Sequence, residues 1–221
     1  KDIPNLDETL EKAVKYGVFG TKMRSVINHY NEKGIKDIVD QQFKIGLQIA
    51  SHGLVPIIEP ETTITSEDRE KSEILLHDLI KEHLNNLDDN IKVILKVSIP
   101  VNPHLYDDIL LDKHVVRIVA LSGGFSQEIA NEKLKHIKGL IASFSRALLE
   151  NLTYQQSEAE FDDTISNPLS HFKKVTTFFF SHKYSLVYKS SIFLSIVCSN
   201  KIAPKILSPL KAGDLIILVL I

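Results

Sequence analysis

Apolar and polar residues follow two different periods along the first 165 residues of the chain. Apolar residues spaced three or four positions apart predict amphipathic helices, and short β-branched apolar runs predict strands covered on both faces. Helices are predicted over residues 5–16, 35–52, 67–84, 104–112, 126–137 and 147–165. Strands are predicted over residues 18–27, 54–58, 91–99, 115–121 and 140–145.

One helix followed by five strands that alternate with helices predicts an α/β architecture built on a parallel sheet. Both a closed barrel and a doubly wound sheet fit this order. Both also place their functional sites at the carboxyl ends of the strands. The periodicity therefore indicates where to look for a site, and leaves the two architectures open.

The octapeptide LVPIIEPE carries Glu59 and Glu61 at the end of an apolar run. Side chains alternate along a strand, so the two carboxylates share one face, where they repel each other and are partly desolvated. This environment favours a protonated carboxyl near neutral pH, as acid/base catalysis requires. The same octapeptide also fits a strand that ends in a solvated acidic loop.

Lys96 lies in the middle of an apolar strand, in the run VILKVSI. Desolvation and a second cation nearby, for which Lys22 is the candidate, both favour the neutral amine that attacks carbonyl groups. The alternative is a lysine that extends its charged end along the sheet into water.

Further polar residues follow the last strands. Ser122, Gly123 and Gly124 enter a helix and can offer backbone N–H groups to a phosphate. Arg146 can clamp a phosphate or carboxylate with two hydrogen bonds. Their simpler interpretations are an ordinary glycine turn and a surface arginine. With Lys22, Glu59, Glu61 and Lys96, these residues are expected at one mouth of the sheet.

Composition narrows the classes of function. The net charge of −2 with no basic face argues against nucleic acid as a partner. The nine histidines form no metal-ligand spacing, so we expect no metal and no other cofactor. Cys198 is the single cysteine, which excludes an internal disulfide and fits a cytoplasmic protein. The chain starts with lysine and shows no secretory signal, so we expect a fragment of a longer protein.

Residues 166–221 differ in character from the rest. They contain seven lysines and a single acidic residue, Asp214. Within them, the stretch FFFSHKYSLVYKSSIFLSIVC has neither helical nor strand period. Lysines interrupt every apolar run before it could span a bilayer, so no membrane anchor is expected. We predict a poorly ordered tail that is appended to a domain at residues 1–165 and unrelated to it. The sequence of the tail looks like out-of-frame or unspliced translation.

Five blocks of residues 1–165 together resemble class I fructose-1,6-bisphosphate aldolase, most closely its bacterial-type branch. The blocks are VFGTKMRSVI, GLVPIIEPE, VILKVSIP, VVRIVALSGGFS and LIASFSRAL, in the family's order and spacing. The resemblance implies a (β/α)8 barrel that cleaves fructose 1,6-bisphosphate in glycolysis through a Schiff base. The chain would supply about the last five strands.

The resemblance also implies roles for individual residues. Lys96 resembles the Schiff-base lysine, Glu59 the general acid/base, and Glu61 the carboxylate that orients and polarises it. Lys22 resembles the lysine that supports the charge of the site, with Arg24 as its companion on the strand. Ser122, Gly123, Gly124 and Arg146 resemble the residues that bind the two phosphates of the substrate.

The match has gaps that affect the expected activity. No counterpart is found for the family's first three strands, for the aspartate that takes part in carbon–carbon cleavage, or for a further active-site lysine. Five strands cannot close an eight-strand barrel, so an open sheet edge is expected. We therefore predict an aldolase that can form a homo-oligomer, with little or no cleavage by this chain alone. The alternatives are a non-catalytic aldolase-like chain that binds phosphorylated ligands or proteins and, less favoured, a transaldolase-type enzyme.

Overall fold

The computed structural model describes residues 3–144, 153–164, 194–197 and 216–219. Its helices are α1 (Leu6–Lys15), α2 (Glu32–Ser51), α3 (Arg69–Asn85) and α4 (Gln127–Lys135), with a 3-10 turn, η1, at Ile109–Leu111. Its strands are β1 (Gly20–Ile27), β2 (Val55–Thr62), β3 (Val93–Ser98), β4 (Val115–Leu121), β5 (Leu140–Ala142), β6 (Leu194–Val197) and β7 (Ile216–Val219).

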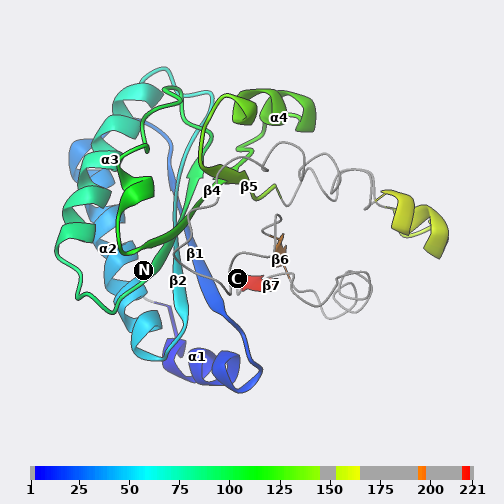
Figure 1. The fold of residues 1–221 in the computed structure, drawn as a ribbon, viewed down its shortest axis with the longest axis horizontal. Helices are drawn as coiled ribbons and strands as arrows, with labels where there is room; N and C mark the ends of the chain where they lie inside the picture. Colours follow the sequence, from blue (N-terminus) through cyan, green and yellow to red (C-terminus); the bar gives the residue numbers. More distant parts are fainter. Residues whose placement is uncertain (1–2, 145–152, 165–193, 198–215, 220–221) are drawn as a thin grey trace.

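The described strands form one parallel sheet in the order β5-β4-β3-β2-β1-β7-β6. Strands β1 to β5 are neighbours in chain order, and α2 and α3 cover the face of the sheet on the left of Figure 1. A doubly wound sheet reverses its strand order and carries helices on both faces. The sequential strand order, with helices packed on one face of the sheet, therefore identifies a partial (β/α)8 barrel. This is the fold class predicted from the sequence.

The main core lies between this sheet and its helices. Val39 and Phe43 of α2, Ile80 of α3 and Leu134 of α4 pack there against the outward side chains of the strands, such as Ile58. The other face carries a smaller apolar cluster of Ile57, Ile94, Val119 and Ile141, one from each of β2 to β5. A barrel fills its interior with such layers of strand side chains.

Strand β2 is longer than predicted. It continues past Ile58 to Thr62, because β1 pairs with it in register from Gly20–Val55 to Ile27–Thr62. Glu59 and Glu61 consequently lie inside a buried strand, and the alternative of a solvated acidic loop is wrong.

Two predicted helices are shorter in the structure. Residues 104–112 contain only the turn η1, because aspartate and asparagine side chains there bond to nearby backbone N–H groups. Within residues 147–165, the described part turns helical only at 158–164. A capping box sets that start: Glu160 accepts from the N–H of Ser157, and Ser157 Oγ accepts from the N–H of Glu160.

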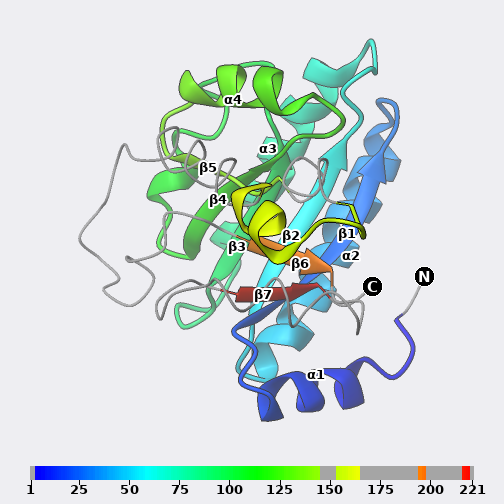
Figure 2. The same ribbon diagram turned by 90° about the vertical axis from the view of Figure 1, so that its right-hand side faces the viewer.

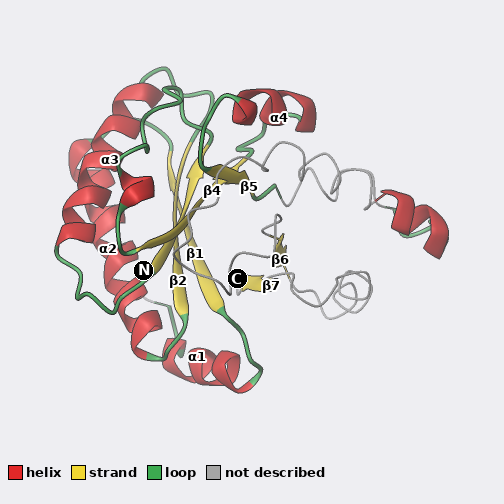
Figure 3. Cartoon of the chain, viewed as in Figure 1, coloured by secondary structure: helices red, strands yellow, loops and turns green. Residues whose placement is uncertain are grey.

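The edge of β1 is not left open. β7 pairs with it through Thr21 and Leu218, and β6 pairs with β7, on the side of the sheet seen in Figure 2. Residues 194–197 and 216–219 of the predicted tail thus form strands, which Figure 3 shows in yellow. The division into a domain at 1–165 and a separate tail stays a prediction. No described helix is long and apolar enough to cross a bilayer.

Substituting Gly20 with alanine should destabilise the fold by about 1–3 kcal/mol. A Cβ at this position would lie 2.3 Å from the backbone carbonyl oxygen of Val55, so β1 or β2 would have to move. Chemical denaturation measures the loss. As a comparison, Gly17→Ala meets no atom within 4 Å and adds only the strain of a φ of 72°, so a larger loss for Gly17→Ala would contradict the steric argument.

Candidate active site

Three charged side chains from neighbouring strands meet on the inner face of the sheet. Glu59 of β2 lies between two lysines: its Oε2 is 2.5 Å from Lys22 Nζ of β1, and its Oε1 is 3.4 Å from Lys96 Nζ of β3. Glu59 Oε2 receives no hydrogen bond of good geometry from the described residues. The contact with Lys22 is therefore an ion pair.

The cluster is buried above an apolar floor. Only 4% of each of the side chains of Lys96 and Glu59 is exposed, and 11% of that of Lys22. Ile57 and Ile94, two positions before Glu59 and Lys96 on the same strands, belong to the inner apolar cluster. Side chains two apart share a face, so these isoleucines form the layer directly beneath the charges.

Burial lowers the pKa of the Lys96 amine, and the charge of Lys22 lowers it further. Glu59 and, more weakly, Glu61 act in the opposite direction. The net direction is toward a neutral, nucleophilic amine, as predicted from its apolar strand neighbours. The alternative of a lysine that reaches into water is wrong for this chain.

Glu61 has a cation of its own. Its Oε2 accepts a hydrogen bond of 2.8 Å from Nε of Arg24, whose side chain is half exposed. The pair raises the pKa of the Arg24 guanidinium through this hydrogen bond. The two carboxylates are thus not left to repel each other, since β1 supplies each of them with a partner.

The loop after β4 contains two glycines in the left-handed region of backbone conformation. Gly123 and Gly124 have φ values of 63° and 114°, which side chains rarely adopt. Ser122 is buried, and Ser126 caps α4 by accepting from the N–H of Ile129. The two glycines therefore let the chain turn from β4 into the start of α4. Arg146 lies outside the described residues.

Sequence reasoning missed Gln42, which is 1% exposed on α2. Its amide bonds to both backbone polar atoms of Glu59 and to Ser25 Oγ. A signal was present in the sequence. Gln42 occupies the apolar stripe of its helix between Val39 and Gly46, where a polar residue needs buried partners.

A buried ion pair behind β2 and β3 was also missed. Arg69 Nε donates to Glu73 Oε1 at 2.6 Å, and the guanidinium also donates to the carbonyl of Ile99. Glu73 further accepts from Thr62 Oγ1 at 3.2 Å and from the N–H of Val101 at 2.8 Å. The pair thereby connects the carboxyl ends of the two strands that carry Glu59 and Lys96.

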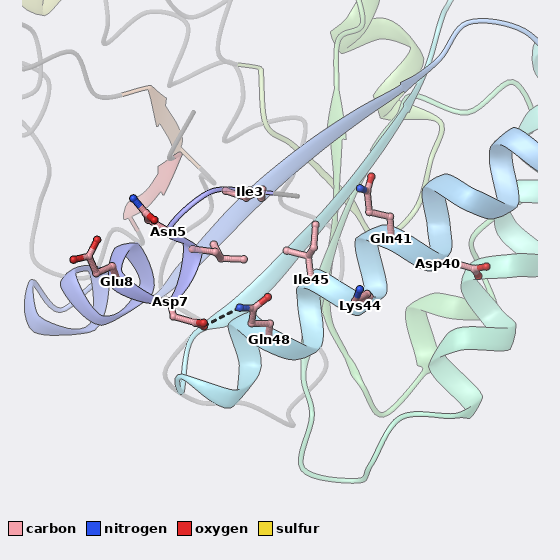
Figure 4. A pocket seen from close by; sticks show the side chains of 10 residues that line it. Ile3, Asn5, Asp7, Glu8, Asp40, Gln41, Lys44, Ile45 and Gln48 are labelled. Carbon is pink, nitrogen blue, oxygen red and sulfur yellow. Dashed lines mark hydrogen bonds between the residues drawn. The ribbon is translucent and has the colours of Figure 1, made fainter. Parts of the chain in front are cut away.

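A hollow of about 720 Å³ lies away from this cluster, between α1 and α2 (Figure 4). Asp7 and Gln48 join across it by a hydrogen bond of 2.8 Å. None of the predicted site residues lines it. Among the described residues, no group of three or more histidine, cysteine or acidic side chains could hold a metal ion.

The fold and the cluster define a class: a partial (β/α)8 barrel with a buried lysine set against a carboxylate on adjacent strands. No family model matches the chain. It is 57% identical over 169 residues to a class 1 fructose-bisphosphate aldolase of Clostridium acetobutylicum and 50% identical to one of Synechocystis, in both cases over 76% of its own length.

A solved fructose-bisphosphate aldolase of Plasmodium falciparum superimposes with a TM-score of 0.54 at 19% identity, covering 78% of this chain and 63% of that one. At this identity the likeness concerns the fold. The matched part of our chain is thus similar to class 1 fructose-bisphosphate aldolases, and the resemblance predicted from five sequence blocks is confirmed. The chain spans 57% and 56% of the length of the two curated relatives.

Proposed function

We propose that this chain carries the Schiff-base site of a class I fructose-bisphosphate aldolase acting on a sugar bisphosphate. The observation that supports it best is the contact of Glu59 with both Lys96 and Lys22 in a buried cluster. A desolvated amine beside a carboxylate has the two groups that imine formation needs, a nucleophile and a group that takes up a proton and returns it.

The proposed reaction begins at Lys96. The Glu59 carboxylate takes a proton from the Lys96 ammonium group, with which it is in contact, and the neutral amine attacks the ketose carbonyl carbon. The nitrogen passes a proton to the oxygen to give a carbinolamine, and protonated Glu59 then returns its proton to the hydroxyl group, which leaves as water. The resulting iminium withdraws electrons, so the carbon–carbon bond between the third and fourth sugar carbons can break and leave an enamine. Lys22 balances the charge of Glu59, and Glu61, held by Arg24, orients the acid.

Cleavage also needs a base for the proton of the hydroxyl group on the fourth carbon. The resemblance assigns that step to an aspartate without a match in this sequence. We propose Ser122, Gly123 and Gly124 for one phosphate and Arg146 for the other. These contacts would orient the substrate, and correct orientation is a large part of enzymatic rate enhancement.

Borohydride trapping tests the proposal. The 221-residue chain, incubated with dihydroxyacetone phosphate and reduced, should gain one covalent adduct on the peptide that contains Lys96. Cleavage of fructose 1,6-bisphosphate by the same chain should stay near background. Failure to form any adduct, while phosphorylated sugars still bind, would support the alternative of a non-catalytic binding chain.

A further inference from the structure

The backbone pairing of β2 with β3 stops where the cluster begins, and beyond it Ser98 Oγ of β3 bonds to both backbone polar atoms of Thr62 on β2. Their register contains only the pairs Ile57–Ile94 and Ile58–Leu95, whereas β1 stays paired with β2 as far as Thr62. The next residues along the two strands are Glu59 and Lys96. Backbone hydrogen bonds between β2 and β3 therefore do not fix the distance between Glu59 and Lys96.

Gln42 joins the backbone of Glu59 to α2 and, through Ser25, to β1. Its Oε1 accepts from the N–H of Glu59 at 2.9 Å, and its Nε2 donates to the carbonyl of Glu59 at 3.1 Å and to Ser25 Oγ at 3.0 Å. The N–H and the carbonyl of one residue belong to the two peptide planes that flank its Cα. Holding both planes limits φ and ψ of Glu59 and so fixes the direction of its side chain.

We propose that Gln42 is a positioning residue that aims the Glu59 carboxylate between Lys22 and Lys96. This role adds a residue to the proposed function, and its relevance to catalysis rests on that function. The simpler interpretation is that Gln42 only stabilises the packing of α2 on the sheet. That role would affect the free energy of unfolding and leave the electrostatics of Lys96 unchanged.

The protonation of Lys96 distinguishes the two roles without any substrate. Glu59, Lys22 and Glu61 are the charged groups that act on it. The chain can be labelled with ¹³C at the lysine Cε atoms, and the NMR signal of Lys96 can be followed as the pH is changed. The signal is assigned by its absence from the spectrum of Lys96→Met. Gln42→Met keeps the length of the side chain and removes its hydrogen bonds. Gln42→Asn stays polar but is too short to hold both backbone atoms.

We expect the titration midpoint of Lys96 to fall by about one pH unit in both Gln42 variants. The sign follows because Glu59 stabilises the ammonium form, and a shift from 3.4 Å to about 5 Å weakens that attraction by roughly this amount. Trapping with dihydroxyacetone phosphate should slow by about tenfold or more, since proton transfer by a positioned group contributes at least this factor.

Asn131→Leu is the matched control, because it also removes a buried amide from a helix, on α4. It should leave the Lys96 midpoint unchanged. An unchanged or raised midpoint in folded Gln42 variants would overturn the positioning role. So would loss of folding in both of them while Asn131→Leu folds. An unmodified parent chain that traps no substrate would instead overturn the proposed function, whatever the midpoints show.

Discussion

Lys96→Met should abolish borohydride-dependent attachment of dihydroxyacetone phosphate, a loss of at least about a thousandfold. Removal of a nucleophile costs this much or more in enzymes that form covalent intermediates. Methionine is close to lysine in length and suits the apolar layer around position 96. The variant should therefore fold, with Glu59 still paired to Lys22.

The measurement is peptide mass mapping after reduction, with far-ultraviolet circular dichroism to verify folding. Lys138→Met is the control, since Lys138 is an exposed lysine between α4 and β5. It should retain the adduct in full. An adduct at the parent level in Lys96→Met, mapped to Lys22, would make Lys22 the nucleophile and contradict the assignment.

Arg69→Met should cost about 3–5 kcal/mol of unfolding free energy. The substitution leaves the Glu73 carboxylate buried without its cation and takes a donor from the carbonyl of Ile99. Such a loss is a large part of the 5–15 kcal/mol typical of a folded domain. Equilibrium denaturation in urea measures it as a lower midpoint.

Two further variants sharpen this test. Arg69→Lys keeps the charge but lacks the planar fork, so it should reach Glu73 or Ile99 but not both, and lose an intermediate amount. Lys33→Met breaks the exposed pair of Lys33 with Asp37, where both side chains are mostly in water. It should not shift the midpoint measurably. A loss below about 1 kcal/mol for Arg69→Met would show that the buried pair does not hold β2 and β3 together.

The five strands of residues 1–144 and the intervening long helices were predictable because their apolar periods are strong. Boundaries were less predictable where pairing or side-chain bonding decides them. β2 extends to Thr62 through its partner strand, and residues 104–112 give only one helical turn because short polar side chains bond to the backbone. The edge of β1 was also beyond sequence reasoning, since β7 reaches it from almost 200 residues away.

For LVPIIEPE, the sequence by itself predicted two carboxylates on one face at the end of an apolar strand, with a lysine in the strand before it and another in the strand after it. Alternation along a strand is enough to establish this. Only the tertiary structure decided which cation each carboxylate meets: Glu59 contacts Lys22 and Lys96, and Glu61 contacts Arg24. The register between strands sets those distances, and side chains remote in sequence, such as Gln42, bond to the backbone of Glu59.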